Sequence, residues 1–401
     1  MNLERLAFYF AFASAASLLF SIAVANICLA LSLAALLISG VRLRFPPIAI
    51  PLGLFALGTV ISLALSQDPA AGRPQIRKFF VYLMLLVVSS TFRELRQVRW
   101  LVLAFASLGT LSALRALSQF GAQLQDCGGA YGCLVGERIT GFMSHWMTFG
   151  GQMMMVLMLL TAYLFWASPR PKRPWLIAVC GALVAGAIFA GGTRSIWLAT
   201  AVSGSYLLWF WRRWTVLIAP VVVVVALLAA PPFLRQRFTS AWKPQGELDS
   251  NAHRRVSWRT GFRMIREHPI FGLGPEHVKL HFKDYVPPDV TRLPDGWYGH
   301  LHNIYLHYAA ERGIPTLLAL LWMLGLILRD FSRALRKLPP GPSDARFVLR
   351  GGIAVVIAIL IGGIFEHNLG DSEVLMMFLA TVSCGYLAVE SAERKSDAAG
   401  A

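Results

Sequence analysis

Charged residues are scarce in this chain, and that scarcity argues against an ordinary soluble globular protein. Of the 401 residues only 14% are charged, whereas 56% are hydrophobic. Soluble domains usually carry about 25% charged residues. The apolar residues form continuous runs of membrane-spanning length, without the alternation of apolar and polar residues that marks a transmembrane β-barrel. The composition therefore predicts an all-α polytopic membrane protein.

Other features are missing as well, and each absence removes a class of function. The five cysteines include no CxxC pair and no Cys/His cluster, which argues against a metal site. No Walker motif is present, and the Gly272–Gly274 fragment lacks the rest of a dinucleotide fingerprint, so ATP is not the expected energy source. The first apolar stretch, 6–40, is too long for a cleavable signal peptide and is interpreted as two short spans or as one long span that turns back near Ser21.

Acidic residues are few, so the chain has a formal net charge of +16. Most basic residues lie in short loops between apolar runs, where the positive-inside rule expects them, and this favours a membrane protein over a nucleic-acid-binding one. About twelve transmembrane helices are predicted. The apolar runs are 6–20, 22–40, 47–66, 76–91, 97–120, 145–166, 174–191, 195–211, 214–231, 303–328, 347–366 and 372–391.

The loop charges predict the orientation of these helices. With the N-terminus in the cytoplasm, alternate loops are cationic with few acids, and the C-terminus is cytoplasmic too. The opposite side receives the segments 121–144, 192–194, 232–302 and 367–371. We therefore expect an N-terminal transmembrane bundle over 1–231, a large extracytoplasmic loop over 232–302, and C-terminal helices with a short cytoplasmic tail over 303–401.

Two cysteines, Cys127 and Cys133, fall on the outer side, which is oxidising. A disulfide that closes the 121–144 loop and a pair of free thiols are equally compatible with this placement. Cys28, Cys180 and Cys384 are interpreted as apolar packing residues within helices.

The long outer loop is more basic than the positive-inside rule predicts. Residues 232–301 contain eleven basic and seven acidic side chains, and five of the basic ones lie within 254–266, which has helical spacing. Arg255, Arg259 and Arg263 share one face of that helix. Such a helix suits anionic headgroups or a lipid-linked phosphate, because the arginine fork binds two phosphate oxygens at once. The alternative is a solvated amphipathic face without a ligand.

Arginines also stand at the ends of other outer helices. Arg194 lies at the mouth of the 195–211 helix, and Arg138 precedes the helix that begins near residue 145. A single arginine at such a place would anchor lipid headgroups. Because several outer loops each offer one, we expect the arginines to converge on a diphosphate.

A group of histidines lies at the C-terminal end of the long outer loop. His302 and Asn303 open the run 303–328, and His300 lies two residues earlier. A neutral imidazole accepts a proton near neutral pH, so His302 is a candidate base for an acceptor hydroxyl that attacks a sugar–phosphate carbon. A structural, hydrogen-bonded role is expected for His277, His281 and His307.

Carboxylate pairs suited to a glycosidase or to a metal-dependent glycosyltransferase are not evident. Glu366, Asp371 and Glu373 flank one outer turn, without the spacing of metal ligands. The Glu366-His367-Asn368 cluster either serves the site or caps a helix.

Together these motifs resemble the O-antigen ligase/polymerase superfamily over nearly the whole chain. The similar segments are Gly192-Thr193-Arg194-Ser195, Arg254 with Trp258, His268-Pro269-Ile270-Phe271-Gly272-Leu273-Gly274, His302-Asn303-Ile304-Tyr305-Leu306 running to Glu311-Arg312-Gly313, and more weakly Arg138-Ile139-Thr140-Gly141.

The resemblance implies a metal-independent, inverting glycosyltransferase of the C-type membrane architecture, without a cofactor. Such ligases transfer a polysaccharide from undecaprenyl diphosphate to lipid A-core, at the periplasmic face of the bacterial inner membrane. The implied partners are these two lipid-linked glycans and membrane lipids, and not nucleic acid.

By position, the resemblance makes His302 the catalytic histidine, with Arg194 and Arg254 holding the donor diphosphate. Further donor-binding candidates are Arg255, Arg259 and Arg138, and supporting residues are Asn303, His300 and Tyr305. Because Arg254 and Arg255 are adjacent, either of them could correspond to the arginine of the family motif.

Other functions share parts of this pattern. Polysaccharide polymerases and protein O-oligosaccharyltransferases carry the same motifs, and the modest length favours the ligase over the protein-directed enzymes. A transporter or flippase of a lipid-linked or anionic solute would also show about twelve helices. Transport predicts ionisable residues or broken helices within the membrane, for which only Arg115 is a candidate.

Overall fold

The computed structural model describes residues 2–243 and 250–400, and within them it consists of helices and loops without a strand. Glu247 and Asp249, two of the seven acids of the long loop, lie outside the described residues. The all-α prediction is confirmed over the described part of the chain. The helices are α1 (Leu3–Ser17), α2 (Ile22–Ile38), α3 (Ala49–Ala64), α4 (Pro69–Arg77), α5 (Phe79–Thr91), α6 (Leu95–Asp126), α7 (Tyr131–Gly136), α8 (Trp146–Trp166), α9 (Pro174–Ala190), α10 (Arg194–Trp211), α11 (Thr215–Ala229), α12 (Pro232–Thr239), α13 (Ser250–Glu267), α14 (His277–His281), α15 (Ile304–Lys337), α16 (Asp344–Gly363) and α17 (Ser372–Gly400), with 3₁₀ turns η2 (Phe282–Tyr285) and η3 (Asn368–Gly370).

Each of the twelve predicted apolar runs coincides with one of these helices. Five helices of the described residues are long and apolar enough to cross a membrane, namely α6, α8, α15, α16 and α17. Four apolar helices are shorter, namely α2, α3, α9 and α11. These helices fit a multi-pass membrane protein, and the number of twelve crossings stays a prediction.

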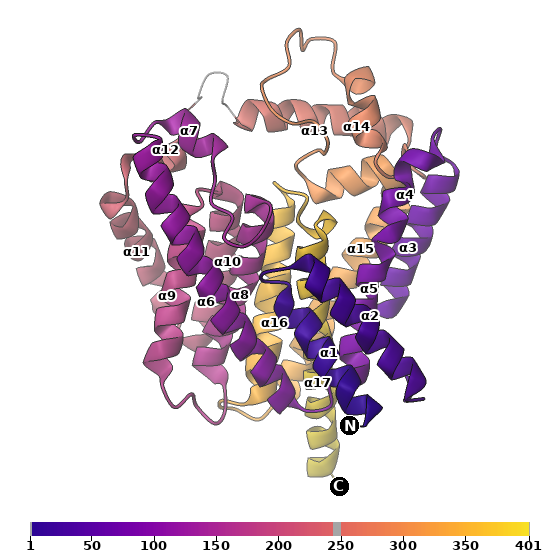
Figure 1. Cartoon of the computed structure of the whole chain (residues 1–401), viewed down its shortest axis with the longest axis vertical. Helices are drawn as coiled ribbons and strands as arrows, with labels where there is room; N and C mark the ends of the chain where they lie inside the picture. Colours follow the sequence, from indigo (N-terminus) through magenta and orange to yellow (C-terminus); the bar gives the residue numbers. More distant parts are fainter. Residues whose placement is uncertain (1, 244–249, 401) are drawn as a thin grey trace.

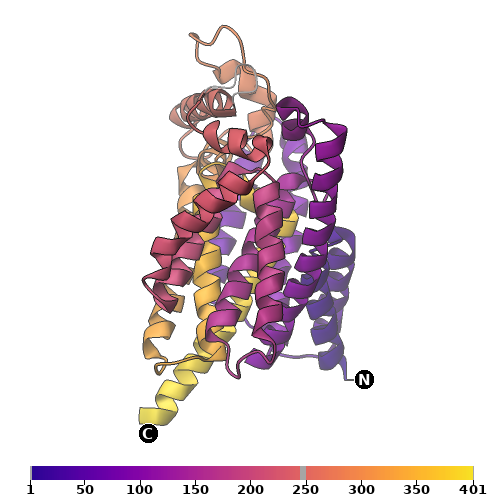
Figure 2. The ribbon, with the colours of Figure 1, turned by 90° about the vertical axis from the view of Figure 1, so that its left-hand side faces the viewer.

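The axes of most helices are roughly aligned, with both chain ends at one end of the bundle and α13 and α14 at the other (Figure 1). The view from the side shows the same separation (Figure 2). The segments that the loop charges assigned to the outer side, including α7 and α12, lie at the α13 end (Figure 1). The charge pattern predicted that these segments share one side, and which side faces the cytoplasm stays a prediction.

The centre of the bundle is formed by α8, α16 and α17, whose apolar residues are largely buried. The helix α16 packs against α8, α10 and α15, and α17 packs against α5. By contrast, α11 leaves Val221, Val222 and Val225 more than half exposed. An apolar exposed helix is expected where a membrane protein meets lipid.

A break in α15 connects two of the sequence motifs. Gly313 has φ +81° and ψ 164°, which interrupts the helix, and Pro315 lacks the N–H that would bond to the carbonyl of Glu311. The loop 268–274 takes over the lost hydrogen bonds. Leu273 N donates to Ala310 O and Gly274 N to Glu311 O, both at 2.9 Å.

The same loop also fixes the residue after the break. Ile314 N donates to Pro269 O at 2.8 Å. A β-carbon on Gly313 would stand 1.8 Å from Ile270 O, so only glycine allows this approach. The His268–Gly274 motif and the Glu311–Gly313 motif therefore form one joint, which holds the long loop against α15.

The predicted outer loop contains its own small core. Val256 and Met264 of α13, Phe282, Leu301 and Ala310 are buried together. The helix predicted over 254–266 is confirmed as part of α13. Its buried face anchors it to the start of α15, and this contact brings the arginines of α13 towards His302.

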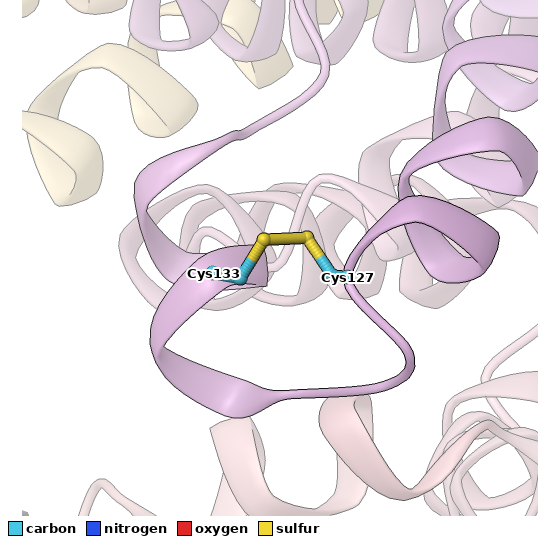
Figure 3. The surroundings of a disulfide bond; sticks show 2 residues. All are labelled: Cys127 and Cys133. Atoms are coloured by element: carbon cyan, nitrogen blue, oxygen red, sulfur yellow. A yellow bond between two sulfur atoms is a disulfide. The ribbon is translucent and has the colours of Figure 1, made fainter.

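Cys127 and Cys133 form a disulfide, which decides between the two alternatives left open by the sequence (Figure 3). The bond joins the end of α6 to α7. Cys28, Cys180 and Cys384 are free.

Candidate active site

The backbone around His302 is held by its neighbours on both sides. Asn303 is the N-cap of α15, and its Oδ1 accepts from Tyr305 N at 3.0 Å and Leu306 N at 2.9 Å. The N–H of His302 itself donates to His300 Nδ1 at 3.1 Å. The His300 side chain thus holds the main chain of His302, and Asn303 caps the helix that begins directly after it.

His302 adopts an unusual backbone conformation, with φ +48°. Residues with a β-carbon rarely occupy this left-handed region, and each such residue costs about 1–3 kcal/mol. Strained residues of this kind concentrate at functional sites. The conformation therefore marks His302 independently of any sequence motif.

Glu366, in the turn between α16 and α17, is the centre of the site. Its Oε1 accepts from Arg254 Nη2 at 2.9 Å and from Ser195 Oγ at 3.0 Å. Its Oε2 lies 3.9 Å from His302 Nδ1. One buried carboxylate thus joins the mouth of α10, the helix α13 and the start of α15.

The charge of Glu366 is stabilised although the side chain is only 2% exposed. Burial acts to raise the pKa of this carboxyl, but the neighbouring His302 and the charge of Arg254 outweigh it and hold the pKa below its usual value. A carboxylate beside Nδ1 favours the tautomer that carries the proton on Nδ1. The lone pair of Nε2 then remains for a base. Since Trp297 O, 3.4 Å from Nε2, is a carbonyl that only accepts, the ring must turn away from this contact before Nε2 accepts a proton.

Two further imidazoles surround His302 and stay neutral. The ring of His300 lies 4.2 Å from that of His302, and the ring of His253 lies 4.9 Å away. Burial, together with the neighbouring histidines, lowers the pKa of His300 to about 2. Burial, His302 and Arg254 lower the pKa of His253 to about 4. Both are therefore uncharged at neutral pH.

On α13 the structure separates Arg254 from the other predicted arginines. Arg254 reaches Glu366, whereas Arg255 and Arg259 are exposed. Arg259 forms two hydrogen bonds with Asp289, at 2.6 and 2.8 Å. Arg263 donates to the carbonyl of Val286 at 2.7 Å. The predicted face of Arg255, Arg259 and Arg263 is thus distinct from the residue that contacts the site.

Arg194 joins α10 to α13. Its Nη2 donates to Ser250 Oγ at 2.7 Å and to Asn251 Oδ1 at 2.8 Å. The next residue, Ser195, is the one that binds Glu366. Two residues of the Gly192–Ser195 motif therefore contact the site region: Arg194 binds α13, which carries Arg254, and Ser195 binds Glu366.

Arg138 belongs to the same electropositive region. Its guanidinium lies 4.0 Å from the ring centre of Trp146, and its Nε donates to Val135 O at 3.1 Å. Burial and the neighbouring Arg237 lower the pKa of Arg138 to about 9, and Glu366 offsets them only in part. A bound anion would relieve this unfavourable crowding of cations.

Arg237 was not among the candidates from the sequence. It is only 4% exposed, and it donates through Nε to Gly192 O at 3.0 Å and through Nη1 to the Tyr131 hydroxyl at 3.3 Å. It thereby fixes the turn before Arg194. In the sequence Arg237 simply follows the Pro231-Pro232 pair, and nothing there predicts its contact with Gly192.

Tyr305, expected to support the site, binds elsewhere. Its hydroxyl donates to Leu360 O at 2.7 Å, which ties α15 to α16. His277 and His281 also have structural contacts, as expected. His277 Nδ1 lies 2.9 Å from Pro275 O, and His281 Nδ1 lies 3.0 Å from Asp284 Oδ2.

A second buried polar group lies beside the site. His307 Nε2 is 3.4 Å from Glu311 Oε2, and the ring of His307 lies 4.2 Å from that of His367. Arg312 donates to Gln75 Oε1 at 3.1 Å and is also buried. Arg115 alone was predicted as an ionisable residue within a span, and His307, Glu311 and Arg312 near the break in α15 add to that set.

Among the residues that the structure describes, no group of three or more His, Cys, Asp or Glu side chains is arranged to hold a metal ion. The site thus places the His302 imidazole and the Arg254 guanidinium around the buried carboxylate of Glu366.

A histidine, a buried carboxylate and an arginine therefore meet at one end of a helical bundle that fits a membrane protein. Residues 181–321 match the family described as O-antigen ligase. The match confirms the resemblance to the O-antigen ligase/polymerase superfamily, whose members are glycosyltransferase-like ligases and polymerases. It covers Arg194, Arg254 and His302, but not Arg138 or Glu366. The comparison with curated proteins gave no match.

Proposed function

We propose that this protein is a periplasmic O-antigen ligase of the bacterial inner membrane. It transfers a polysaccharide from undecaprenyl diphosphate to lipid A-core, with inversion at the sugar carbon and without a metal ion. The observation that carries the proposal is Glu366, because one buried carboxylate contacts His302, Arg254 and Ser195 together. A base and a phosphate-binding arginine on either side of one carboxylate suit glycosyl transfer from a diphosphate.

On the acceptor side, His302 Nε2 removes the proton from the attacking hydroxyl of lipid A-core. Glu366 orients the ring through Nδ1 and stabilises the imidazolium that forms. The hydroxyl oxygen forms a bond to the sugar carbon while the bond from that carbon to the diphosphate breaks. Attack opposite to the leaving group inverts the configuration.

On the donor side, the electron pair of the broken bond leaves with undecaprenyl diphosphate. Arg254 and Arg194 hold the diphosphate and stabilise the charge that develops on it, and Arg138 adds to the positive field. Fixed guanidinium groups near the membrane surface serve this purpose because they need no reorganisation during the reaction.

In this proposal the 232–302 loop lies in the periplasm between the bundles 1–231 and 303–401. The joint of Gly313 with the 268–274 loop then keeps α13 in register with His302. The break in α15 lies next to this loop, and it is explained as a support for the site. It does not require a transport pathway.

A reconstituted reaction tests the proposal. Purified protein is mixed with undecaprenyl-diphosphate glycan and lipid A-core, and the products are separated by gel electrophoresis and mass spectrometry. Glycan on lipid A-core is the expected result. Chain growth on the carrier would mean a polymerase, glycan on a protein acceptor would mean an oligosaccharyltransferase, and no new glycosidic bond would favour a transporter.

Two arms complete this experiment. The His302→Asn protein is the inactive control, since it lacks the base. Treatment with EDTA is expected to leave turnover unchanged, and loss of turnover that a divalent ion restores would contradict metal independence.

A further inference from the structure

A cavity of about 640 Å³ opens at the end of the bundle opposite to the candidate active site. Its walls come from the loop between α2 and α3 and from the C-terminal parts of α5, α15 and α17. In the predicted orientation this is the cytoplasmic end, where both chain ends also lie (Figure 1). The cavity plays no part in the glycosyl transfer proposed above.

The cavity carries more positive than negative side chains. Its basic residues are Arg44, Arg329, Arg333, Arg336 and Lys337, and its acids are Asp330, Glu390 and Glu393. Each acid has a basic partner. The pairs are Arg44 with Glu390 at 3.2 Å, Arg329 with Asp330 at 2.9 Å, and Lys337 with Glu393 at 3.7 Å.

Two arginines remain after this pairing. Arg333 and Arg336 form no ion pair within the part of the chain that the structure describes, and both are exposed. They stand in the last turns of α15 and line the cavity together. Their guanidinium groups can therefore bind an anion without breaking an existing pair.

Behind these cations the wall is apolar. Phe92 and Ala334 are buried, and Val88 and Leu387 also line the cavity. Phe45, another residue of the lining, is 66% exposed. The positive-inside rule explains basic residues at a cytoplasmic helix end, but it predicts neither a cavity nor an apolar wall. A free inorganic anion would gain nothing from the apolar wall, whereas a phospholipid matches both parts.

We propose that this cavity binds an acidic phospholipid of the cytoplasmic leaflet. The phosphate lies against Arg333 and Arg336, and one acyl chain lies along Phe92 and Leu387. Basic pockets between membrane helices on the cytoplasmic side suit such headgroups. The lipid would add contacts between the ends of α15 and α17, α5 and the α2–α3 loop.

The test measures lipid binding to the whole purified protein. After removal of copurified lipid, the protein is titrated with phosphatidylglycerol or with phosphatidylcholine, and the complexes are counted by native mass spectrometry. Phosphatidylglycerol is expected to bind and to raise the melting temperature, and phosphatidylcholine is not. Equal binding of the two lipids would overturn the proposal.

The variant Arg333→Ala/Arg336→Ala should weaken the binding of phosphatidylglycerol roughly 30-fold, the factor that two basic side chains near an anionic lipid contribute together. Arg333→Lys/Arg336→Lys should keep most of the affinity. The matched control is Arg170→Ala/Arg173→Ala, which removes two exposed arginines of another loop on the same predicted side. Unchanged binding by the first variant, or equal losses in the first variant and the control, would show that no specific site exists.

Two additions keep the test decisive. Millimolar inorganic phosphate should not displace the lipid, and displacement would mean a site for free phosphate instead. If the double alanine variant does not fold, the single variants Arg333→Gln and Arg336→Gln replace it. Each should weaken lipid binding about fivefold, and wild-type affinity in both would contradict the proposal.

Discussion

Arg254 of α13 donates a 2.9 Å hydrogen bond to Glu366, in the turn between α16 and α17. The two residues are separated by 112 positions in the chain. The arginine side chain is 19% exposed and the carboxylate 2% exposed. A charge pair so enclosed has few alternative partners, so it fixes the distance between the long loop and the ends of the central helices.

Glu366→Gln should therefore lower kcat far more than it changes KM. The amide no longer stabilises the imidazolium of His302, and loss of such support for a base costs about 10²–10⁴-fold in rate. The reaction with lipid-linked donor gives kcat and KM directly. Glu373→Gln, in the first turn of α17, is the matched control and should keep its kcat. A kcat of Glu366→Gln within twofold of wild type would rule out the role of this carboxylate.

His302→Asn should abolish transfer while the protein still accumulates in the membrane. Asparagine tolerates the left-handed backbone that His302 adopts at φ +48°, so the base is removed without much added strain. His302→Ala removes the same base but places alanine in that conformation. Turnover should vanish in both variants, and the alanine variant should have the lower melting temperature. Normal turnover in either variant would contradict a catalytic role.

Arg254→Ala and Arg259→Ala should differ strongly, although both residues lie on α13. Loss of Arg254 leaves Glu366 buried without its cation, which costs about 3–5 kcal/mol, and it removes a donor-binding group. Arg259 pairs with Asp289 at an exposed position, where water and salt screen the pair, so its loss should change stability little. Donor KM and melting temperature measure the contrast. Equal effects of the two substitutions would mean that the whole basic helix binds the donor.

The sequence predicted the helices and the end of the molecule that carries the site, for physical reasons. Apolar runs of membrane length form helices whatever their neighbours are, so all twelve runs coincide with helices. The loop charges depend only on sequence position, and they placed Arg194, Arg254 and His302 on one side. The structure then brings Arg254 and His302 to one carboxylate, and Arg194 to the first turn of α13.

The central role of Glu366 was not predictable in the same way. Its partners Ser195 and Arg254 are 171 and 112 positions away, so only the tertiary fold brings them together. The helical repeat of Arg255, Arg259 and Arg263 did not predict the contact of Arg254 with Glu366 either. Arg255 and Arg259 lie on the exposed side of α13, whereas Arg254, between the exposed and buried sides, contacts Glu366.

The stability of the protein should fall on mild acidification because His300 is neutral when buried. Burial lowers the pKa of His300 to about 2, whereas a histidine in the unfolded chain has a pKa near about 6.5. Below pH 6.5 the unfolded state binds a proton that the folded state does not. Stability is therefore lost as the pH falls, by about 2 kcal/mol at pH 5.

The variant His300→Asn isolates this contribution. Its amide oxygen can accept from the N–H of His302 as Nδ1 does, but it does not titrate. Melting temperatures between pH 7.5 and 5 should fall less steeply than in wild type. His281→Gln, which removes a partly exposed histidine of α14, is the control and should follow the wild-type slope. If His300→Asn also follows it, His300 does not cause the acid sensitivity.

Gly313→Ala should disrupt the joint between α15 and the long loop. A β-carbon there would meet Ile270 O at 1.8 Å, and the residue has φ +81°, so the loop must move away or the protein must unfold. We expect low expression, or a folded protein without transfer activity whose 268–274 loop is cut readily by protease. Gly325→Ala is the matched control in the same helix, because nothing lies within 4 Å of its β-carbon. Normal activity and protease resistance of Gly313→Ala would show that the joint is not needed to hold α13 beside His302.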